Sequence, residues 1–162
     1  LITHQHVPRG QLQGVLDSER FTLLRSLDFF TSFSDIELWE VVHRAKWQRF
    51  SHGHSLYRKG EEGRTFHIIA QGELEVFRDG QKVAQFGVGT SVGEMAYLAP
   101  NPALRRHSSD VVVSLPATTI SFNPDSLAQL SPKCHRLFDE AFIRVLVRRL
   151  HEAQESLAQS RH

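Results

Sequence analysis

The sequence predicts a mainly β fold with flanking helices: a double-stranded β-helix, or jelly roll, with N-terminal helices and a long C-terminal helix. Three observations support this class. The middle of the chain holds many short β-branched runs divided by glycine turns, a helix-start signal precedes them, and a long amphipathic pattern follows them. With 162 residues, the chain suits one domain. We expect a linker or disordered terminus at 1–16 and a domain at 17–160, with helices at 17–46, a roll at 47–123 and helices at 124–159.

The N-terminal part predicts two helices and an aromatic portion of the core. Asp17–Glu19 could cap the first helix. Ser34 and Glu37 have the spacing of a capping box, in which Ser at the N-cap is followed three residues later by Glu. We expect the helix that they open to bury Ile36 on its inner face. The Phe side chains within 29–33 should enter the core.

Short strand-like runs fill the middle of the chain. Their alternating or β-branched residues fit half-buried strands, and Asp79-Gly80 is a two-residue hairpin signal. Gly60, Gly63 and Gly72 are expected at positions that need a positive φ or a close approach of the backbone. The expected strands are Trp47–Phe50, Ser55–Arg58, Phe66–Ala70, Glu73–Arg78, Lys82–Phe86, Asp110–Leu115 and Ala117–Phe122.

The C-terminal part predicts a short helix and then a long one. Asn123-Pro124 and Ser131-Pro132 each join an N-cap residue to Pro at the first helical position, and the second helix should reach about Gln159. Its two apolar stripes are Phe138, Ala141, Phe142 and Val145, and Ile143, Leu146, Leu150, Ala153 and Leu157. One stripe can pack on the roll, so we expect the other to meet a partner helix in a homodimer.

Bulk properties exclude several classes of protein. A net charge of +1 does not indicate a general nucleic-acid binder. The single cysteine, Cys134, cannot form an intramolecular disulfide and favours a reducing, cytoplasmic compartment. No apolar run approaches the ~20 residues of a membrane span, and no signal peptide is visible. Because the chain does not begin with Met, we expect it to belong to a longer protein whose other domains are its partners.

A glycine turn and a basic loop suggest a nucleotide site. Backbone N–H groups at a glycine turn and nearby cations suit a phosphate, whereas a carboxylate would repel it and instead accept a hydrogen bond from a sugar hydroxyl. Both kinds of group occur within Ser91–Val113. The candidate ligand-binding residues are Gly93, Glu94, Met95, Ala96, Arg105, Arg106, His107, Ser108 and Ser109. No catalytic or metal-ligating residue is expected among them.

Two motifs resemble those of one family. Gly93-Glu94-Met95-Ala96, followed after a gap by His107-Ser108-Ser109-Asp110-Val111, resembles the phosphate-binding cassette of cyclic nucleotide-binding domains, in which Gly-Glu-x-Ala precedes Arg-Ser/Thr-Ala-x-Val. Leu56–Gly72 is similar to the family's Gly-acid-x-Gly turn, apolar strand and Gly. The resemblance covers roughly Phe21–Gln159. It implies a non-catalytic regulatory module that binds cAMP or cGMP and needs no cofactor.

The resemblance also implies roles for single residues. Glu94 would accept the ribose 2′-hydroxyl, and Gly93 and Ala96 would lend backbone amides. The phosphate-clamping Arg of the family falls on His107, and its small Ala falls on Ser109. With a reference pKa of about 6.5, a His in this place is mostly neutral at pH 7 unless the phosphate raises its pKa.

Two arginines lie close to the altered clamp. Arg105 and Arg106 are just upstream of it, so a shift in the register of the loop could return a guanidinium to the phosphate. In this hypothesis ligand binding draws the last helix over the pocket, with Phe138 and Phe142 as candidates for stacking on the base.

Two other functions remain open at this stage. A degenerate relative would keep the fold for dimerisation or docking and bind no nucleotide; the altered Arg position favours it. The third hypothesis is a metal-dependent cupin enzyme, for which His52 and His54 supply a His-x-His pair. The next acid, Glu61, lies too far along for cupin spacing, and a second His motif is missing.

Overall fold

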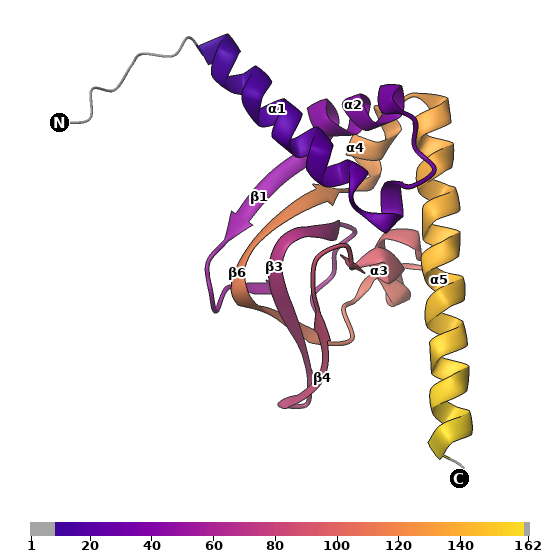
Figure 1. Cartoon of the computed structure of the whole chain (residues 1–162). Coiled ribbons are helices and arrows are strands. Elements are labelled where there is room, and N and C mark those ends of the chain that lie inside the picture. The colour runs from indigo at the N-terminus through magenta and orange to yellow at the C-terminus, as the bar shows by residue number, and fades with distance from the viewer. Residues whose placement is uncertain (1–8, 161–162) are drawn as a thin grey trace, which may run out of the picture.

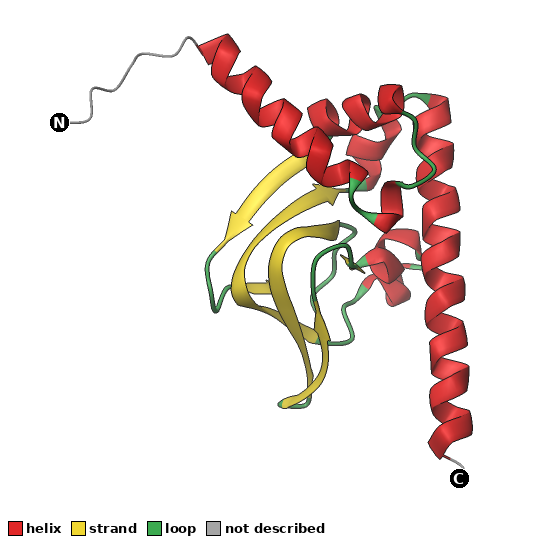
Figure 2. Cartoon of the chain, viewed as in Figure 1, coloured by secondary structure: helices red, strands yellow, loops and turns green. Residues whose placement is uncertain are grey.

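The computed structural model describes residues 9–160. Figure 1 shows a curved layer of strands with helices gathered at one end of it and a long C-terminal helix along one side, and Figure 2 shows the same division by secondary structure. The elements are α1 (Arg9–Arg25), η1 (Asp28–Phe30), α2 (Asp35–Arg44), β1 (Lys46–Phe50), β2 (Ser55–Tyr57), β3 (Phe66–Arg78), β4 (Gln81–Phe86), β5 (Ser91–Val92), α3 (Glu94–Leu98), η2 (Pro102–Arg105), β6 (Asp110–Phe122), α4 (Pro124–Ala128) and α5 (Pro132–Ser160). This arrangement confirms the predicted fold class.

Two long antiparallel strands, β3 and β6, form the centre of the roll. They pair from Phe66 opposite Phe122 to Phe77 opposite Asp110, within the order β1-β6-β3-β4; β2 joins β6, and β5 joins β3. Gly72, with a φ of 89°, lies where the register of β3 shifts. A bulge of this kind bends a strand without ending it. The separate runs expected on either side of Gly72 are therefore one strand, and β6 likewise unites the last two expected runs.

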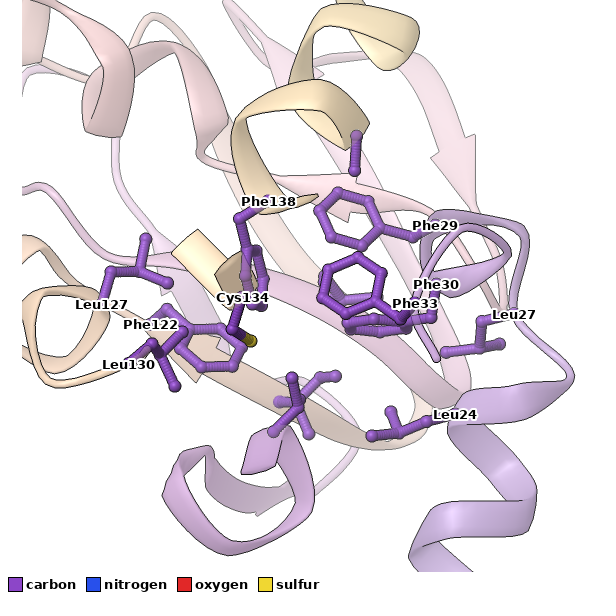
Figure 3. Packing of buried hydrophobic residues seen from close by; sticks show 14 of the residues in the cluster. Leu24, Leu27, Phe29, Phe30, Phe33, Phe122, Leu127, Leu130, Cys134 and Phe138 are labelled. Carbon is purple, nitrogen blue, oxygen red and sulfur yellow. The ribbon is translucent and has the colours of Figure 1, made fainter. Parts of the chain in front are cut away.

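The helices and the roll share an aromatic core. Phe29, Phe30 and Phe33 are buried, as the sequence predicted, and pack on Phe138 of α5, whose ring centroid also lies 4.9 Å from that of Phe122 in β6. Figure 3 shows these rings facing one another between helices and strands. A second apolar cluster fills the inside of the roll. The first apolar stripe of α5 therefore packs the N-terminal half of this helix against both the N-terminal helices and the roll.

Three expectations about the N-terminal helices are wrong. Helix α1 begins at Arg9, inside the expected linker, and continues through Asp17–Glu19 without a start there. Ser34 does precede α2, but its side chain makes no capping hydrogen bond, and Ile36 is 81% exposed. Residues 1–8 of the expected linker lie outside the described residues, and the domain boundaries remain predictions.

Glu37 and Glu40 of α2 hold the start of α5. Glu37 lies 3.0 Å from the Lys133 Nζ atom, and this hydrogen bond lowers the pKa of Glu37. A Glu40 carboxylate oxygen accepts a hydrogen bond from the Ser131 backbone amide at 2.6 Å. The first turn of α5 is thus tied to α2 by charged groups.

None of the helices in the described part combines the length and apolarity of a membrane span.

The bulge at Gly72 generates a stability prediction. A Cβ atom there would overlap the Pro116 carbonyl oxygen and lie 2.6 Å from Ala117 Cα, in addition to the positive φ. Gly72→Ala should lower the free energy of unfolding by about 3 kcal/mol or more, measured by urea denaturation. Gly80→Ala is the matched control, because Gly80 has a φ of +80° but nothing within 4 Å, and it should cost only about 1 kcal/mol. Equal losses in both variants would contradict the role of close approach.

Candidate functional site

The glycine turn predicted to lie at the site connects β5 to α3. Gly93 has a φ of +84°, and a Cβ atom there would overlap the Tyr57 hydroxyl and lie 2.8 Å from the Thr65 carbonyl oxygen. That hydroxyl donates a hydrogen bond to the same carbonyl at 2.7 Å. Because Tyr57 occupies the space behind the turn, only glycine fits at this position. The turn consequently directs the next residue, Glu94, toward α5.

A cavity of about 570 Å³ lies between this turn, the loop before β6, and α5. All of the nine candidate residues except Arg105 line it, and Met95 lies at its rim with 65% of its surface exposed. Figure 1 shows α3 beside the middle of α5. Helix α5 contributes Leu146 and Arg149 to the lining. The two motifs separated by the variable loop therefore meet at one cavity, as the resemblance implied.

Glu94 is buried and forms an ion pair with Arg149 of α5. Its Oε1 atom contacts Arg149 Nη1, while Arg149 Nη2 donates a hydrogen bond to the Ser91 carbonyl oxygen at 2.6 Å. The second carboxylate oxygen, Oε2, is buried and has no hydrogen-bond partner. Burial lowers the pKa of Arg149, and the charge of Glu152 acts in the opposite direction. Arg149 thus binds one oxygen of the Glu94 carboxylate, and the other oxygen, Oε2, remains without a hydrogen-bond donor.

The sequence interpretation missed Arg149. It lies 55 positions beyond Glu94, and no short motif joins the two. A signal was available in the helical spacing, because Arg149 continues the inward stripe of Phe142 and Val145 by one more step of four. A cation on the buried stripe of a helix needs an acidic partner, and Glu94 was the acidic residue expected nearby.

The loop before β6 does not present a free guanidinium in place of the altered clamp. Arg105 donates to the carbonyl oxygens of Ala99 and Pro100, at 3.3 and 3.4 Å. Arg106 lines the cavity but donates to the Gly60 carbonyl oxygen at 2.9 Å. The expected shift of register is therefore not seen.

His107 packs on the ring of Tyr57 with a centroid distance of 4.0 Å. Burial lowers the pKa of His107, with the charge of Glu61 acting in the opposite direction, so the imidazole is neutral near pH 7. Its backbone is fixed by hydrogen bonds with Glu61 and Gly60 across the loop, at 2.9 and 2.8 Å. One guanidinium that the sequence did not suggest is close by: Arg78 Nη2 lies 3.5 Å from the Ser109 hydroxyl.

Phe138 and Phe142 are not available to a base, which corrects the expectation that they stack on it. Both are at most 1% exposed and belong to the core between the helices and the roll. Where α5 passes the cavity it presents Leu146 instead. The apolar side of the cavity comes from the strands, through Val76, Phe86 and Val111.

The metal-dependent enzyme hypothesis requires a set of metal-ligating side chains, and the described part of the chain does not provide one. Within residues 9–160, no group of three or more His, Cys, Asp or Glu side chains is placed to hold a metal ion. His54 instead stacks on Phe50, with centroids 4.8 Å apart. The structure therefore gives His54 of the His-x-His pair a packing contact.

The model of the cyclic nucleotide-binding domain family matches residues 47–133, which is more than half of the chain. The chain therefore belongs to the cyclic nucleotide-binding domain family. The matched segment runs from the start of β1 to the first turn of α5 and includes the cavity-lining loops, but it stops before Arg149.

Three known proteins show how far the likeness extends. The cAMP-dependent protein kinase regulatory subunit of Eremothecium gossypii is 32% identical over 62 residues, which cover 38% of this chain and 14% of that protein. A cyclic nucleotide-binding domain from Methylobacillus flagellatus has a TM-score of 0.75 at 22% identity, covering 90% of this chain and 84% of that one. The regulatory subunit of a cAMP-independent protein kinase A from Trypanosoma brucei has a TM-score of 0.68 at 22% identity, covering 93% and 51%.

The likeness covers only part of each of the curated relatives. The chain spans only 14% and 17% of the length of two kinase regulatory subunits that it matches. The solved structures share the fold at low sequence identity, so they locate the roll and α5 but do not identify a ligand for this chain.

A buried histidine behind the site generates a prediction about pH. His67 of β3 lies in a polar groove of about 450 Å³ that shares Tyr57 and His107 with the cavity, and its Nδ1 atom is 2.8 Å from the Thr119 hydroxyl. Burial, and then the charges of Lys46 and His107, lower the pKa of His67 to about 4. Because the unfolded chain binds this proton more tightly, stability should be lost as pH falls from about 6.5 toward 4, by about 3 kcal/mol.

The measurement is urea denaturation of the wild type and of His67→Gln across this pH range. The variant should lose much less stability on acidification than the wild type. His52→Gln, which changes an exposed histidine, should follow the wild type. Parallel pH profiles for the wild type and His67→Gln would contradict the assignment.

Proposed function

We propose that this chain is a non-catalytic regulatory module that binds a cyclic nucleotide, cAMP or cGMP, and transmits binding to a larger parent protein through α5. The observation that carries the proposal is the free Oε2 atom of Glu94, a buried carboxylate oxygen without a partner beside a cavity of about 570 Å³. A buried acceptor without a partner is costly, and a donor supplied by a ligand removes that cost. A sugar hydroxyl is such a donor.

The remaining lining suits the other parts of a nucleotide. The Ser108 and Ser109 hydroxyls and Arg106 line the cavity and would face the phosphate, with Arg78 next to Ser109. The apolar lining, which includes Val76, Phe86, Val111 and Leu146, would cover the base. The ribose would then lie at Glu94.

The residues proposed to face the phosphate favour a second function, in which the domain binds no nucleotide. A neutral His107 replaces the charged clamp, and Arg105 and Arg106 already donate to carbonyl oxygens. A degenerate domain that serves only in dimerisation or docking would show the same features. The outer face of α5 fits such a role, because Ile143, Val147, Leu150 and Leu157 are each about 60% exposed there. A homodimer through this face remains a prediction, as does a cytoplasmic location.

Calorimetric titration with cAMP, cGMP and adenosine separates the two functions. We expect a cyclic nucleotide to bind the wild type, with at least about tenfold weaker binding to Glu94→Gln, since a hydrogen bond to a charged group contributes about 1.5–3 kcal/mol. Glu140→Gln, an exposed carboxylate on the same chain, is the control and should bind as the wild type does. Absence of heat with all three ligands would leave the docking function in place of ligand sensing.

The same titration tests the phosphate side. If His107 takes a proton to hold the phosphate, its pKa is raised in the complex, so affinity should be highest below the pKa of the free protein and should fall as pH rises through the pKa of the complex. His107→Arg should tighten cAMP binding by about tenfold or more and remove this pH dependence. Equal affinity for adenosine and cAMP would exclude any contribution from the phosphate.

A further inference from the structure

A second cavity lies between α5, the chain around η1 and the segment that joins β4 to β5. Its volume is about 480 Å³, which falls within the roughly 300–1,000 Å³ of small-molecule sites. Among the described residues it shares only Phe86 and Arg149 with the cavity at Glu94. We call it the arginine groove, because Arg144, Arg148 and Arg149 of α5 all line it.

Two of these arginines carry charges that no carboxylate of the described chain pairs with. Arg144 donates to the Ser32 hydroxyl at 2.6 Å and to the Phe29 carbonyl oxygen at 3.3 Å, and both acceptors are uncharged. Arg148 is exposed and makes no hydrogen bond or ion pair with other described residues. Like charges four residues apart on a helix repel each other. The two guanidinium groups therefore favour an anion from outside the chain.

Two carboxylates also line the arginine groove. Asp28 and Glu152 form no ion pair with an arginine of the described chain, although the charge of Glu152 acts on Arg149. With three arginines and two carboxylates, the lining keeps a net charge of +1. The groove is thus polar on both signs but favours a negative ligand.

The Ser91 hydroxyl is a second, independent sign of a ligand. Ser91 is 3% exposed, and its Oγ atom is buried without a hydrogen-bond partner. Side chains alternate along a strand, so Val92 packs inside the roll while Ser91 lines the arginine groove. A buried hydroxyl without a partner costs free energy, which a ligand that supplies an acceptor recovers.

The backbone around Ser91 is already fixed. The Gly89 amide donates to the Ile69 carbonyl oxygen at 2.7 Å, and the Ile69 amide donates to the Thr90 carbonyl oxygen at 2.9 Å. The hydrogen bonds of Arg144 likewise tie α5 to the chain around η1. A site that is formed before the ligand arrives loses less entropy on binding.

We propose that the arginine groove binds a phosphate monoester that carries an apolar group, at a site separate from the cavity at Glu94. A phosphate monoester has a charge of about −1.5 to −2 at pH 7 and three acceptor oxygens, which suit guanidinium and hydroxyl donors. Arg148 and the Ser91 hydroxyl would donate to the phosphate. Leu27, Phe29 and Val145 also line the groove and would contact the apolar group.

The probe for this site is phenyl phosphate, titrated into the isotope-labelled chain and followed by NMR. We expect the largest amide shifts within residues 26–29, 88–91 and 144–149. Phenol, which lacks the phosphate, and inorganic phosphate, which lacks the ring, should each bind at least about fivefold more weakly. Largest shifts within residues 106–109 would place the phosphate in the cavity at Glu94 and overturn the proposal.

Two variants test the donors. Arg148→Gln and Ser91→Ala should each weaken binding of phenyl phosphate by about fivefold. Ser91→Ala should not lower the urea midpoint of unfolding, because it removes a buried hydroxyl that has no partner. Arg136→Gln is the matched control: it removes the same charge from an exposed position of α5 outside the groove, and it should bind as the wild type does. Equal affinities of Arg148→Gln and Arg136→Gln would overturn the proposal.

The phosphate can belong to a free metabolite or to a lipid headgroup, and sedimentation with vesicles distinguishes these sources. The vesicles are phosphatidylcholine alone and phosphatidylcholine with phosphatidic acid. Sedimentation of the wild type, but not of Arg148→Gln, with phosphatidic acid would assign the site to a headgroup. Binding of phenyl phosphate without sedimentation would assign it to a free monoester. Failure of the wild type to bind either probe would overturn the proposal and would leave the proposed nucleotide function untouched.

Discussion

The ion pair between Glu94 and Arg149 is the interaction on which the site, the cavity and the position of α5 all depend. A carboxylate that is only 2% exposed requires a charged or hydrogen-bonded partner, and this partner comes from a helix at the other end of the chain. The pair closes one wall of the cavity and leaves a single carboxylate oxygen for a ligand. The pair lies further along α5 than the charged contacts that fix the first turn of this helix to α2. The helix is therefore held at two separate points. Any shift of α5 that keeps its start in place must break the second point.

In the framework around this pair, Tyr57 connects the glycine turn to the loop before β6. Tyr57 occupies the space behind Gly93 and also stacks on the ring of His107. One side chain therefore contacts both the glycine turn and the loop before β6. His107 is partly buried there, and burial lowers its pKa, which favours the neutral imidazole. At the glycine turn the cavity thus offers a buried carboxylate oxygen, whereas at the loop before β6 it offers serine hydroxyls and Arg106, which already donates to a carbonyl oxygen. Under the proposed function, affinity for a cyclic nucleotide and affinity for its sugar alone can therefore differ in this chain.

The sequence was sufficient for the fold and for eight of the residues that line the candidate cavity, because both follow from local signals. The hairpin at Asp79-Gly80, the Pro-started helices and the Gly93-Glu94 run act through neighbouring residues, and family membership is confirmed by a match that begins at residue 47. For Arg149 the helical spacing indicated only an inward position, because its role arises from pairing with a residue 55 positions away. The errors at Phe138 and Ile36 have a similar cause: periodicity shows that a helix has an apolar side, but tertiary packing decides which residues of that side meet the core.

The most direct test of the central claim compares cAMP with 2′-deoxy-cAMP on the wild-type chain by isothermal calorimetry. Loss of this one hydroxyl should weaken binding by about tenfold or more, because a charged acceptor loses its donor. In Glu94→Ala the two ligands should bind alike. Equal affinity of the wild-type chain for both ligands would contradict the claim that the free oxygen of Glu94 receives the sugar.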